Sequence, residues 1–413
     1  MIADSVPMIA GTVATGFERV REEFMRNFTE RGEVGAALTV TVAGKTVVDL
    51  WGGLADAASR RPWSEDTLVH VWSSTKGATA LCAHLLIARG ELDINAPVTR
   101  YWPEFAAAGK ADVPVRYLLS HQAGLPAVRE PLPHGAFYDW DLMTGALART
   151  EPFWTPGTRH GYHGLTFGFL VGELVRRVSG QGLGDFFRSQ VSDPLGLDFW
   201  LGLPESAEAR VAPTIAPDFT APGTDVPGLY RTAMAEPGSA AGLMLFNSGG
   251  YMTPGESDTR AAHAAVMGGI GGVTNARGLA GMYRPLALGG SFDGVQLVAP
   301  SQIPLMSAVE SASSIDAILG VPTRFALGFV KHIDNRHLAA GDREGILLSD
   351  AAFGHAGIGG SLGFADPSAR MSFGYAMNRQ GSGLGVNDRG QALIDAVYRA
   401  VGYCSADGMW FRA

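Results

Sequence analysis

The chain has 413 residues, of which 46% are hydrophobic and 17% charged, so it is long enough to bury a large core. Its formal net charge of -8 and the lack of any run of Lys or Arg argue against nucleic acid as a partner. No apolar stretch approaches membrane-spanning length, and the N-terminus lacks the pattern of a secretory signal. We therefore expect a cytoplasmic protein that does not bind a membrane.

The chain contains two cysteines, Cys82 and Cys404, so neither a disulfide framework nor a CxxC metal site is indicated. Cys82 lies in an apolar helical pattern, which favours a place in the core. Of the ten histidines, His160 and His163 lie close together but have no third ligand nearby. We therefore expect no metal ion and no cofactor.

The N-terminal part begins with apolar residues at helical spacing over 17–28, which predict a helix. Alternating apolar residues over 38–42, a Gly44-Lys45 turn and an apolar run over 47–51 then predict a β-hairpin. The chain is therefore expected to start with a helix and two paired strands.

Ser73 and Lys76 precede an amphipathic pattern that ends at Gly90, so we expect a helix that begins at Ser73. Residues i and i+3 share a helix face, which lets the Lys76 amine reach the Ser73 hydroxyl. A serine is a poor nucleophile until a base takes its proton, and burial lowers the pKa of a lysine enough for that role. A polar helix cap and a solvated lysine would also explain the SxxK pattern alone. The chain uses Arg for nearly all its other positive charges, which makes this lysine informative.

Tyr162 lies in a Gly-punctuated loop just before apolar residues at helical spacing over 167–178. Loops held by rigid elements commonly carry catalytic groups, and a tyrosine near a buried lysine can ionise or relay a proton. A tyrosine that buries its ring and hydrates its hydroxyl is the simpler explanation of this residue alone. Only its combination with Ser73 and Lys76 favours the catalytic interpretation.

The remainder of the chain changes from loops to strands. Residues 203–260 are rich in Gly, Pro, Ala and Ser, and we expect long ordered loops there. Further on, strands are predicted over 323–332, 361–366 and 371–378, before a closing helix over 391–401. Strands near both termini indicate one sheet built from both ends of the chain.

We accordingly expect two domains. Residues 1–72 and 310–413 would form a discontinuous α/β sheet domain. Residues 73–309 would form a mostly helical domain with long loops, inserted between the two parts of the first.

His355, Ala356 and Gly357 lie in a glycine-rich segment that runs into the C-terminal strands. Glycines let a substrate approach the backbone closely, and an edge strand here would supply an amide N–H to an oxyanion. A glycine-rich turn between strands explains the segment equally well when it is taken alone.

In this order and spacing, the three segments resemble the serine β-lactamase and penicillin-binding superfamily, and most closely the family VIII carboxylesterases, which are similar to class C β-lactamases. Residues 118–125 and 193–197 also resemble that group, so the likeness extends over most of the chain. It implies an α+β fold of the β-lactamase/transpeptidase type. In this fold an antiparallel sheet flanked by helices lies beside a mostly helical second domain, and the active site lies in the cleft between them.

The resemblance also implies roles for individual residues. Ser73 matches the acylated serine, Lys76 its lysine partner and Tyr162 the tyrosine of the YxN motif. The triplet His355-Ala356-Gly357 matches KTG and would bind substrate, and the backbone N–H groups of Ser73 and Ile358 would form the oxyanion hole. Whether Lys76 or Tyr162 is the general base stays open.

Two departures from the family pattern bear on the substrate. Gly164 stands where a β-lactamase has the Asn of YxN, so the side-chain amide that would hold a β-lactam is missing. His355 stands where KTG has Lys, which replaces a permanent cation with a group largely neutral at pH 7. Both changes weaken the case for penicillin recognition and leave the acyl-transfer residues in place.

We therefore expect a serine hydrolase that cleaves carboxylic esters of short acyl chains or small alcohols through an acyl-enzyme on Ser73, with a small-molecule ester as its partner. Hydrolysis of β-lactams or small amides, or acyl transfer to an alcohol, would use the same residues. A catalytically silent binding protein on this scaffold is the non-enzymatic alternative. The joint presence of Ser73, Lys76 and Tyr162 argues against it. The sequence leaves open whether the chain forms a homo-oligomer.

A second serine pattern competes with the first. Residues 359–363, Gly-Gly-Ser-Leu-Gly, match the GxSxG nucleophile elbow of α/β-hydrolases. That elbow needs a helix directly after the serine, whereas the residues after Ser361 predict a strand end and a turn. We therefore do not expect Ser361 to be the nucleophile.

An aromatic-rich stretch precedes Tyr162. We expect it to wall an acyl or alcohol pocket, although packing in a helical core explains such residues at least as often. The residues concerned are Phe137, Tyr138, Trp140, Phe153 and Trp154.

Overall fold

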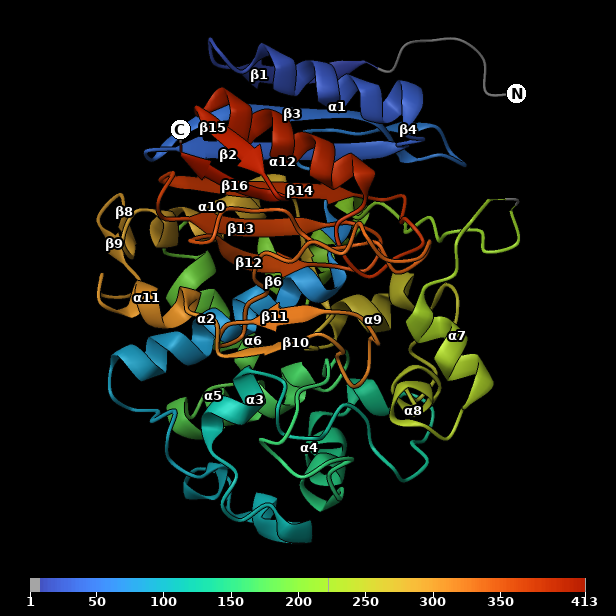
Figure 1. The fold of residues 1–413 in the computed structure, drawn as a ribbon, viewed down its shortest axis with the longest axis vertical. Helices are drawn as coiled ribbons and strands as arrows, with labels where there is room; N and C mark the ends of the chain where they lie inside the picture. Colours follow the sequence, from blue (N-terminus) through green and yellow to red (C-terminus); the bar gives the residue numbers. More distant parts are fainter. Residues whose placement is uncertain (1–7, 222, 413) are drawn as a thin grey trace.

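The computed structural model describes residues 8–221 and 223–412 (Figure 1). Its main element is an antiparallel sheet with strands from both ends of the chain, in the order β1-β3-β2-β14-β13-β12, with β4 paired to β3. The strands are β1 (Ile9–Val13), β2 (Gly35–Val42), β3 (Lys45–Asp56), β4 (Arg61–Pro62), β12 (Phe353–Ala356), β13 (Leu362–Asp366) and β14 (Met371–Met377).

The pairing of β2 with β14 joins the N-terminal and C-terminal parts of the sheet. In this pairing Val40 lies opposite Phe373, and both side chains are buried. The predicted hairpin is confirmed, since β2 and β3 pair across the turn with Val42 opposite Lys45. Strand β12 ends the sheet, and its outer edge faces the helical part of the molecule (Figure 1).

Helices cover both faces of the sheet. Helices α1 (Glu18–Glu30) and α12 (Asp388–Ala400) pack on one face, and α10 (Ala276–Ala287) packs on the other. Gly374 allows the close approach of α10, because a Cβ at this position would lie 2.3 Å from the carbonyl oxygen of Ala276. Helix α10 thus packs on the sheet, although it lies within residues 73–309, the range predicted for the helical domain. The domain boundaries themselves stay a prediction.

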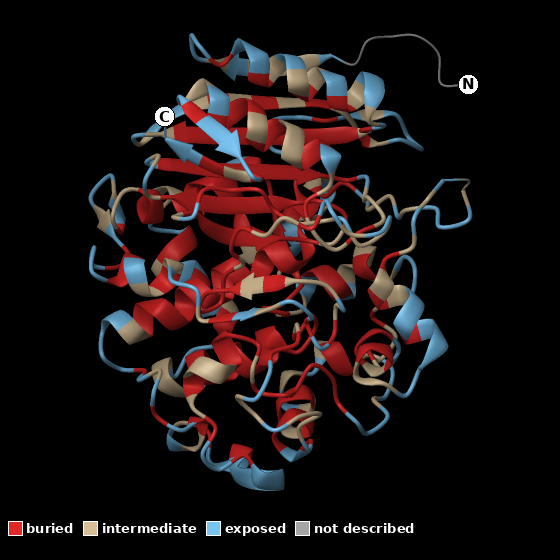
Figure 2. Ribbon diagram, in the orientation of Figure 1, coloured by how far each residue is buried: buried red, intermediate tan, exposed pale blue. Residues whose placement is uncertain are grey.

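The helical part surrounds α2, which is buried along nearly its whole length (Figure 2). A helix that is buried on nearly every side must be enclosed by other elements, and here α5 and α6 pack against it. The helices of this part are α2 (Thr75–Ala88), α3 (Val115–Leu119), α4 (Trp140–Arg149), α5 (Phe167–Ser179) and α6 (Leu183–Phe187). A small antiparallel sheet leads into α2 and consists of β5 (Val69–His70), β7 (Gly272–Thr274) and β6 (Phe199–Leu201).

Two local predictions differ from the structure. The glycine- and proline-rich segment 203–260 contains helices α7 (Gly228–Ala235) and α8 (Ala240–Phe246), because short apolar runs between its prolines find buried positions. The strand predicted over 323–332 is reduced to β11 (Thr323–Phe325), which pairs with β10 (Ser311–Ser313). The remaining elements are α9 (Arg260–Ala264), α11 (Gln302–Ser307), β8 (Ser291–Phe292), β9 (Val295–Gln296), β15 (Tyr403–Ala406) and β16 (Met409–Arg412).

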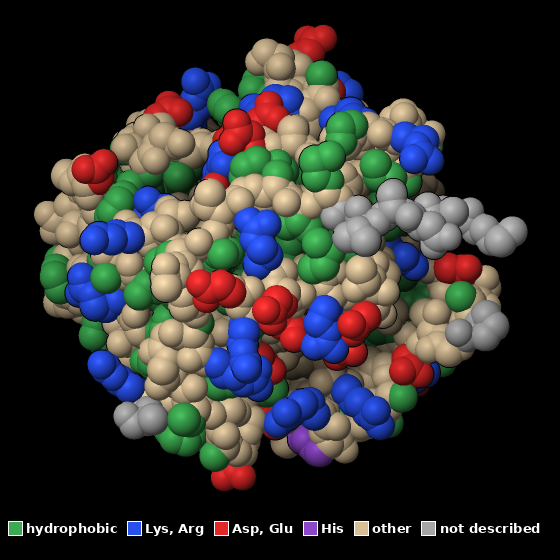
Figure 3. Space-filling view, turned by 90° about the horizontal axis from the view of Figure 1, so that it is seen from above, with side chains coloured by type: hydrophobic (Ala, Val, Ile, Leu, Met, Phe, Trp, Pro, Cys, Tyr) green, Lys and Arg blue, Asp and Glu red, His purple; other side chains and the backbone are tan. Residues whose placement is uncertain are grey.

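The surface at the β1 end of the sheet carries charges of both signs, with basic side chains interspersed among acidic ones (Figure 3). Arg26 on α1, for example, pairs with both Glu23 and Glu30. Among the described residues, no helix is long and apolar enough to cross a lipid bilayer.

Candidate active site

Ser73 lies in a tight turn between β5 and α2. A 3-10 turn over Trp72–Ser74 precedes α2, so the helix predicted from Ser73 begins two residues later, at Thr75. Trp72 has a φ of 48°, a left-handed conformation that is uncommon for a residue with a bulky side chain. Ser73 is only 4% exposed, and its Oγ lies 3.0 Å from Nζ of Lys76.

Lys76 is fully buried, and burial lowers the pKa of its amine well below the ordinary value. Its Nζ also lies 2.7 Å from the carbonyl oxygen of Gly164 and 2.8 Å from that of Gly269. Carbonyl oxygens only accept hydrogen bonds, so a neutral amine donates its two hydrogens to them. Its lone pair then points at the Ser73 hydroxyl, which is the geometry of a general base.

Tyr162 lies against Lys76, with the Lys76 Nζ 4.8 Å from the centre of the phenol ring. Burial and the negative charge of Asp316 raise the pKa of Tyr162, and a hydrogen bond with Ser73 opposes this rise. The phenol therefore stays protonated at neutral pH and is suited to donate a proton rather than to remove one.

His355 and Ala356 end the edge strand β12, and the His355 ring stacks on that of Tyr162 with 6.1 Å between centroids. Burial lowers the pKa of His355 to about 3, so the ring is neutral. Its Nδ1 lies 2.7 Å from the carbonyl oxygen of Ala356 and must carry the proton. The buried Nε2 is then an acceptor, and it has no hydrogen-bond partner in the described structure.

Gly357 brings the third segment against the turn that carries Ser73. A Cβ here would lie 2.3 Å from both the Val71 carbonyl oxygen and the Ser361 hydroxyl, so only glycine fits. No hydrogen bond between described residues uses the N–H of the next residue, Ile358. The N–H of Ser73 lies in the first turn before α2, where helical N–H groups have no carbonyl partner. Both amides are thus available to an oxyanion.

Ser361 has a structural position. It is buried, its hydroxyl donates to the Val71 carbonyl at 2.8 Å, and it lies 3.1 Å from the Ser74 hydroxyl. Strand β13 follows it directly, so the helix that a nucleophile elbow requires is absent at this described position. These contacts tie the third segment to the turn that carries Ser73.

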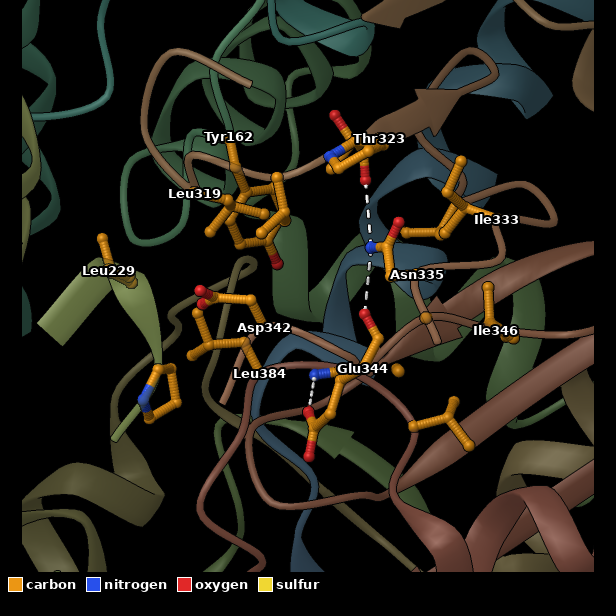
Figure 4. Close-up of a pocket in the computed structure, with 18 of the residues that line it drawn as sticks. Tyr162, Leu229, Leu319, Thr323, Ile333, Asn335, Asp342, Glu344, Ile346 and Leu384 are labelled. Atoms are coloured by element: carbon orange, nitrogen blue, oxygen red, sulfur yellow. Dashed lines mark hydrogen bonds between the residues drawn. The ribbon is translucent and has the colours of Figure 1, made fainter. Parts of the chain in front are cut away.

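Tyr162 and His355 belong to the wall of a pocket, part of which Figure 4 shows. Its wall comes from four separate segments, residues 227–229, 319–325, 330–346 and 384–386, together with Tyr162, His355 and Ala356. Apolar side chains make up much of this wall: Leu229, Leu319, Ile333, Ile346 and Leu384. The pocket can therefore hold an apolar group next to Tyr162 and His355.

The predicted aromatic wall is not the wall of this pocket, because those side chains are engaged elsewhere. Phe137 packs on Phe169, the Trp140 indole donates to Glu173 at 2.8 Å, and the Trp154 ring packs on His163. Tyr138 donates to Glu256. None of Phe137, Tyr138, Trp140, Phe153 and Trp154 lines the pocket.

Three functional groups are absent from the sequence predictions. The carbonyl groups of Gly164 and Gly269 hold Lys76, and backbone groups leave no signal in residue types. Asp316, in a loop far along the chain, accepts a hydrogen bond from the backbone N–H of Tyr162, at 3.0 Å.

Within the described ranges, no group of three or more His, Cys, Asp or Glu side chains is arranged to hold a metal ion.

Comparison with known proteins agrees with this geometry. The family described as Beta-lactamase matches residues 17–397. The esterase/beta-lactamase LipL of Mycobacterium tuberculosis is 34% identical over 389 residues, which cover 93% of this chain and 86% of LipL. A crystal structure of a family VIII carboxylesterase is 39% identical, with a TM-score of 0.82 over 95% of this chain and all of the other. A penicillin-binding protein homologue from Caulobacter crescentus is 34% identical, with a TM-score of 0.80 over 95% and 100% of the two chains.

Proposed function

This chain belongs to the Beta-lactamase family of serine hydrolases, and from that premise we propose that it cleaves carboxylic esters of short acyl chains or small alcohols through an acyl-enzyme on Ser73. The observation that carries the proposal is the contact of the Lys76 amine with the Ser73 hydroxyl, at 3.0 Å, beside an apolar pocket. The expected α+β fold of the β-lactamase type agrees with this membership.

Acylation begins when Ser73 Oγ attacks the ester carbonyl carbon and its proton passes to neutral Lys76. The carbonyl oxygen becomes an oxyanion, which the N–H groups of Ser73 and Ile358 stabilise. As the bond to the alcohol oxygen breaks, Tyr162 donates its proton to that oxygen. The ammonium of Lys76 returns a proton to the tyrosine, the alcohol leaves, and the acyl group stays on Ser73.

Deacylation repeats these steps with water as the nucleophile. Water gives its proton to neutral Lys76, attacks the acyl carbon and forms a second oxyanion in the same pair of amides. When this intermediate collapses, Ser73 Oγ leaves and takes a proton from Tyr162. The ammonium of Lys76 then returns a proton to the tyrosine. The carboxylic acid is released, and the free enzyme is restored.

Two features of the substrate side support esters over β-lactams. The neutral His355 supplies no cation for the carboxylate that a penicillin carries, and its free Nε2 is an acceptor that would repel one. Gly164 contributes its carbonyl to Lys76 and has no side chain to bind an amide. An uncharged ester with an apolar group suits the pocket better.

The test is covalent labelling combined with turnover. The purified protein is treated with a fluorophosphonate, the labelled peptide is identified by mass spectrometry, and Ser73→Ala is the control. We expect label on Ser73 and hydrolysis of p-nitrophenyl butyrate that the control lacks. Label on another serine, or an active Ser73→Ala variant, would sink the proposal.

Hydrolysis of β-lactams is a second candidate because LipL is described as both an esterase and a β-lactamase. The same serine, lysine and tyrosine would act on the lactam carbonyl. Turnover of a chromogenic cephalosporin at a kcat/KM equal to or above that for p-nitrophenyl butyrate would favour this candidate. Faster release of p-nitrophenol on addition of methanol would indicate acyl transfer.

A further inference from the structure

Asp316 is a buried carboxylate between the loop of Tyr162 and the wall of the pocket. It is 1% exposed, and its Oδ1 accepts three backbone N–H groups. The N–H of Tyr162 donates at 3.0 Å, that of Ile318 at 2.8 Å and that of Leu319 at 2.9 Å. One oxygen atom thus fixes both Tyr162 and a turn whose Leu319 side chain lines the pocket.

The other oxygen of Asp316 has its own donors. The hydroxyl of Thr323, a second pocket residue, donates to Oδ2 at 3.1 Å. Because that hydrogen is committed to Asp316, the hydroxyl oxygen accepts from His160 Nε2, 2.8 Å away. The resulting chain runs from the His160 ring through Thr323 to Asp316, and every member of it is buried.

These contacts define the charge of Asp316. Burial raises the pKa of its carboxyl, and the backbone N–H groups oppose the rise. The three backbone N–H groups on Oδ1 can only donate and the Thr323 hydroxyl is placed to donate to Oδ2, so these contacts favour the carboxylate. This charge also raises the pKa of Tyr162, which favours the protonated phenol that a proton donor needs.

We propose that Asp316 is a positioning residue for ester cleavage, which holds Tyr162 as the proton donor to the leaving alcohol and ties it to the pocket wall. The inference rests on the proposed ester hydrolysis. Asp316 does not touch the reacting atoms in this scheme; it acts through Tyr162. An alcohol that is a poor leaving group must be protonated as it departs, whereas p-nitrophenolate leaves without that help.

The experiment uses this difference. Asp316→Asn keeps an acceptor for the three amides and removes the charge. We expect its kcat/KM for ethyl butyrate to fall on the order of 10- to 100-fold, and that for p-nitrophenyl butyrate, with the same acyl group, only a few-fold. In the Tyr162→Phe background the same substitution should have no further effect on ethyl butyrate, because the residue it acts through is already lost.

Asp366→Asn is the matched control. Asp366 lies on β13 and is equally buried. It accepts hydrogen bonds from the hydroxyls of Ser349 and Tyr398 and from two backbone N–H groups. We expect Asp366→Asn to lower stability without changing the ratio of the kcat/KM values for the two esters. If Asp316→Asn does not fold, Thr323→Val replaces it, because this variant removes only one donor to Asp316. We expect Thr323→Val to lower kcat/KM for ethyl butyrate more than that for p-nitrophenyl butyrate.

The outcomes separate the two proposals. Equal losses on both esters, or multiplicative effects of Asp316→Asn and Tyr162→Phe, would overturn the role of Asp316 and leave ester hydrolysis standing. A change in the ratio caused by Asp366→Asn would do the same. A wild-type protein inactive on both esters would overturn ester hydrolysis itself, and the role of Asp316 in it.

Discussion

The amine of Lys76 lies 3.0 Å from the hydroxyl of Ser73 and is held there by two backbone carbonyl groups that only a hydrogen-bond donor can satisfy. A neutral lysine in this position has one favourable orientation, with its lone pair directed at the serine. The proposed nucleophile and its proposed base are therefore arranged before any substrate arrives.

The first prediction concerns the charge of Lys76. Arginine is permanently protonated, so Lys76→Arg would place a cation beside Ser73 that could not accept its proton. We expect kcat/KM for p-nitrophenyl butyrate and the rate of labelling by a fluorophosphonate to fall by about 10²- to 10⁴-fold. Lys110→Arg is the matched control, because Lys110 is also buried and its amine also contacts two carbonyl groups, at 2.6 and 2.7 Å, outside the site. A Lys76→Arg variant as active as this control would exclude lysine as the base.

The second prediction tests the amide of Ile358. Proline has no N–H, so Ile358→Pro would remove one donor to the oxyanion, and we expect kcat to fall by about 10²- to 10³-fold. Ile358→Val keeps the N–H and should retain most of the activity. Circular dichroism of both variants checks that the sheet is intact. If the proline variant remains active with the fold unchanged, the oxyanion is held elsewhere.

The third prediction concerns the protonation of His355. Burial lowers its pKa to about 3, so the ring binds a proton only as the pH falls towards that value. Between pH 5 and 8 its ¹⁵N resonances should stay those of a neutral imidazole with the proton on Nδ1. The measurement is an NMR titration assigned with His355→Gln. A resonance that moves with a midpoint near 6.5 would show a ring able to attract a carboxylate.

The fourth prediction concerns stability in acid. Burial lowers the pKa of His70, His163 and His355 to about 3 and that of His84 to about 4. Below about pH 6.5 the unfolded chain binds protons at these positions and the folded chain does not, so protonation favours unfolding. Each histidine should reduce the free energy of unfolding by up to about 1.4 kcal/mol per pH unit, a slope that is approached as the pH falls from 6.5 to 5. Urea unfolding at several pH values measures this slope.

His84→Gln provides the control for that slope. His84 lies between the Leu327 carbonyl and the Gln302 side chain, away from the catalytic residues. Its replacement should make the dependence of the free energy of unfolding on pH shallower by the contribution of one histidine. A free energy of unfolding that is equal at pH 6.5 and pH 5 would contradict the assignment of neutral buried histidines.

The sequence predicts the parts of the site that depend on local spacing. Ser73 and Lys76 are one helical turn apart, so the geometry of a helix brings them together wherever the segment folds. The sheet strands over 38–42 and 371–378 are also predictable from their local pattern, although helices bury both of their faces in the folded chain. Family resemblance adds Tyr162 and His355, which no local pattern connects to Ser73.

The remaining features depend on tertiary packing. The pocket wall comes from four segments between residues 227 and 386, and no periodicity relates them. The aromatic residues predicted to form a pocket wall do not line this pocket. Phe137 packs on another ring and Trp140 donates a hydrogen bond, both in the helical core. Asp316 is equally hidden, since only the folded chain shows that its carboxylate meets the backbone of Tyr162.

The pairing of β2 with β14 has a consequence for how the protein is made. Ser73 emerges from the ribosome long before Ile358, and β2 has no partner on its inner side until β14 has been synthesised. Contacts of such large sequence separation form slowly and leave apolar strand edges exposed in the nascent chain. A chain that stops before Met371 contains Ser73 but lacks the strand that joins β13 to β2, so we expect hydrolytic activity to arise only at the end of synthesis.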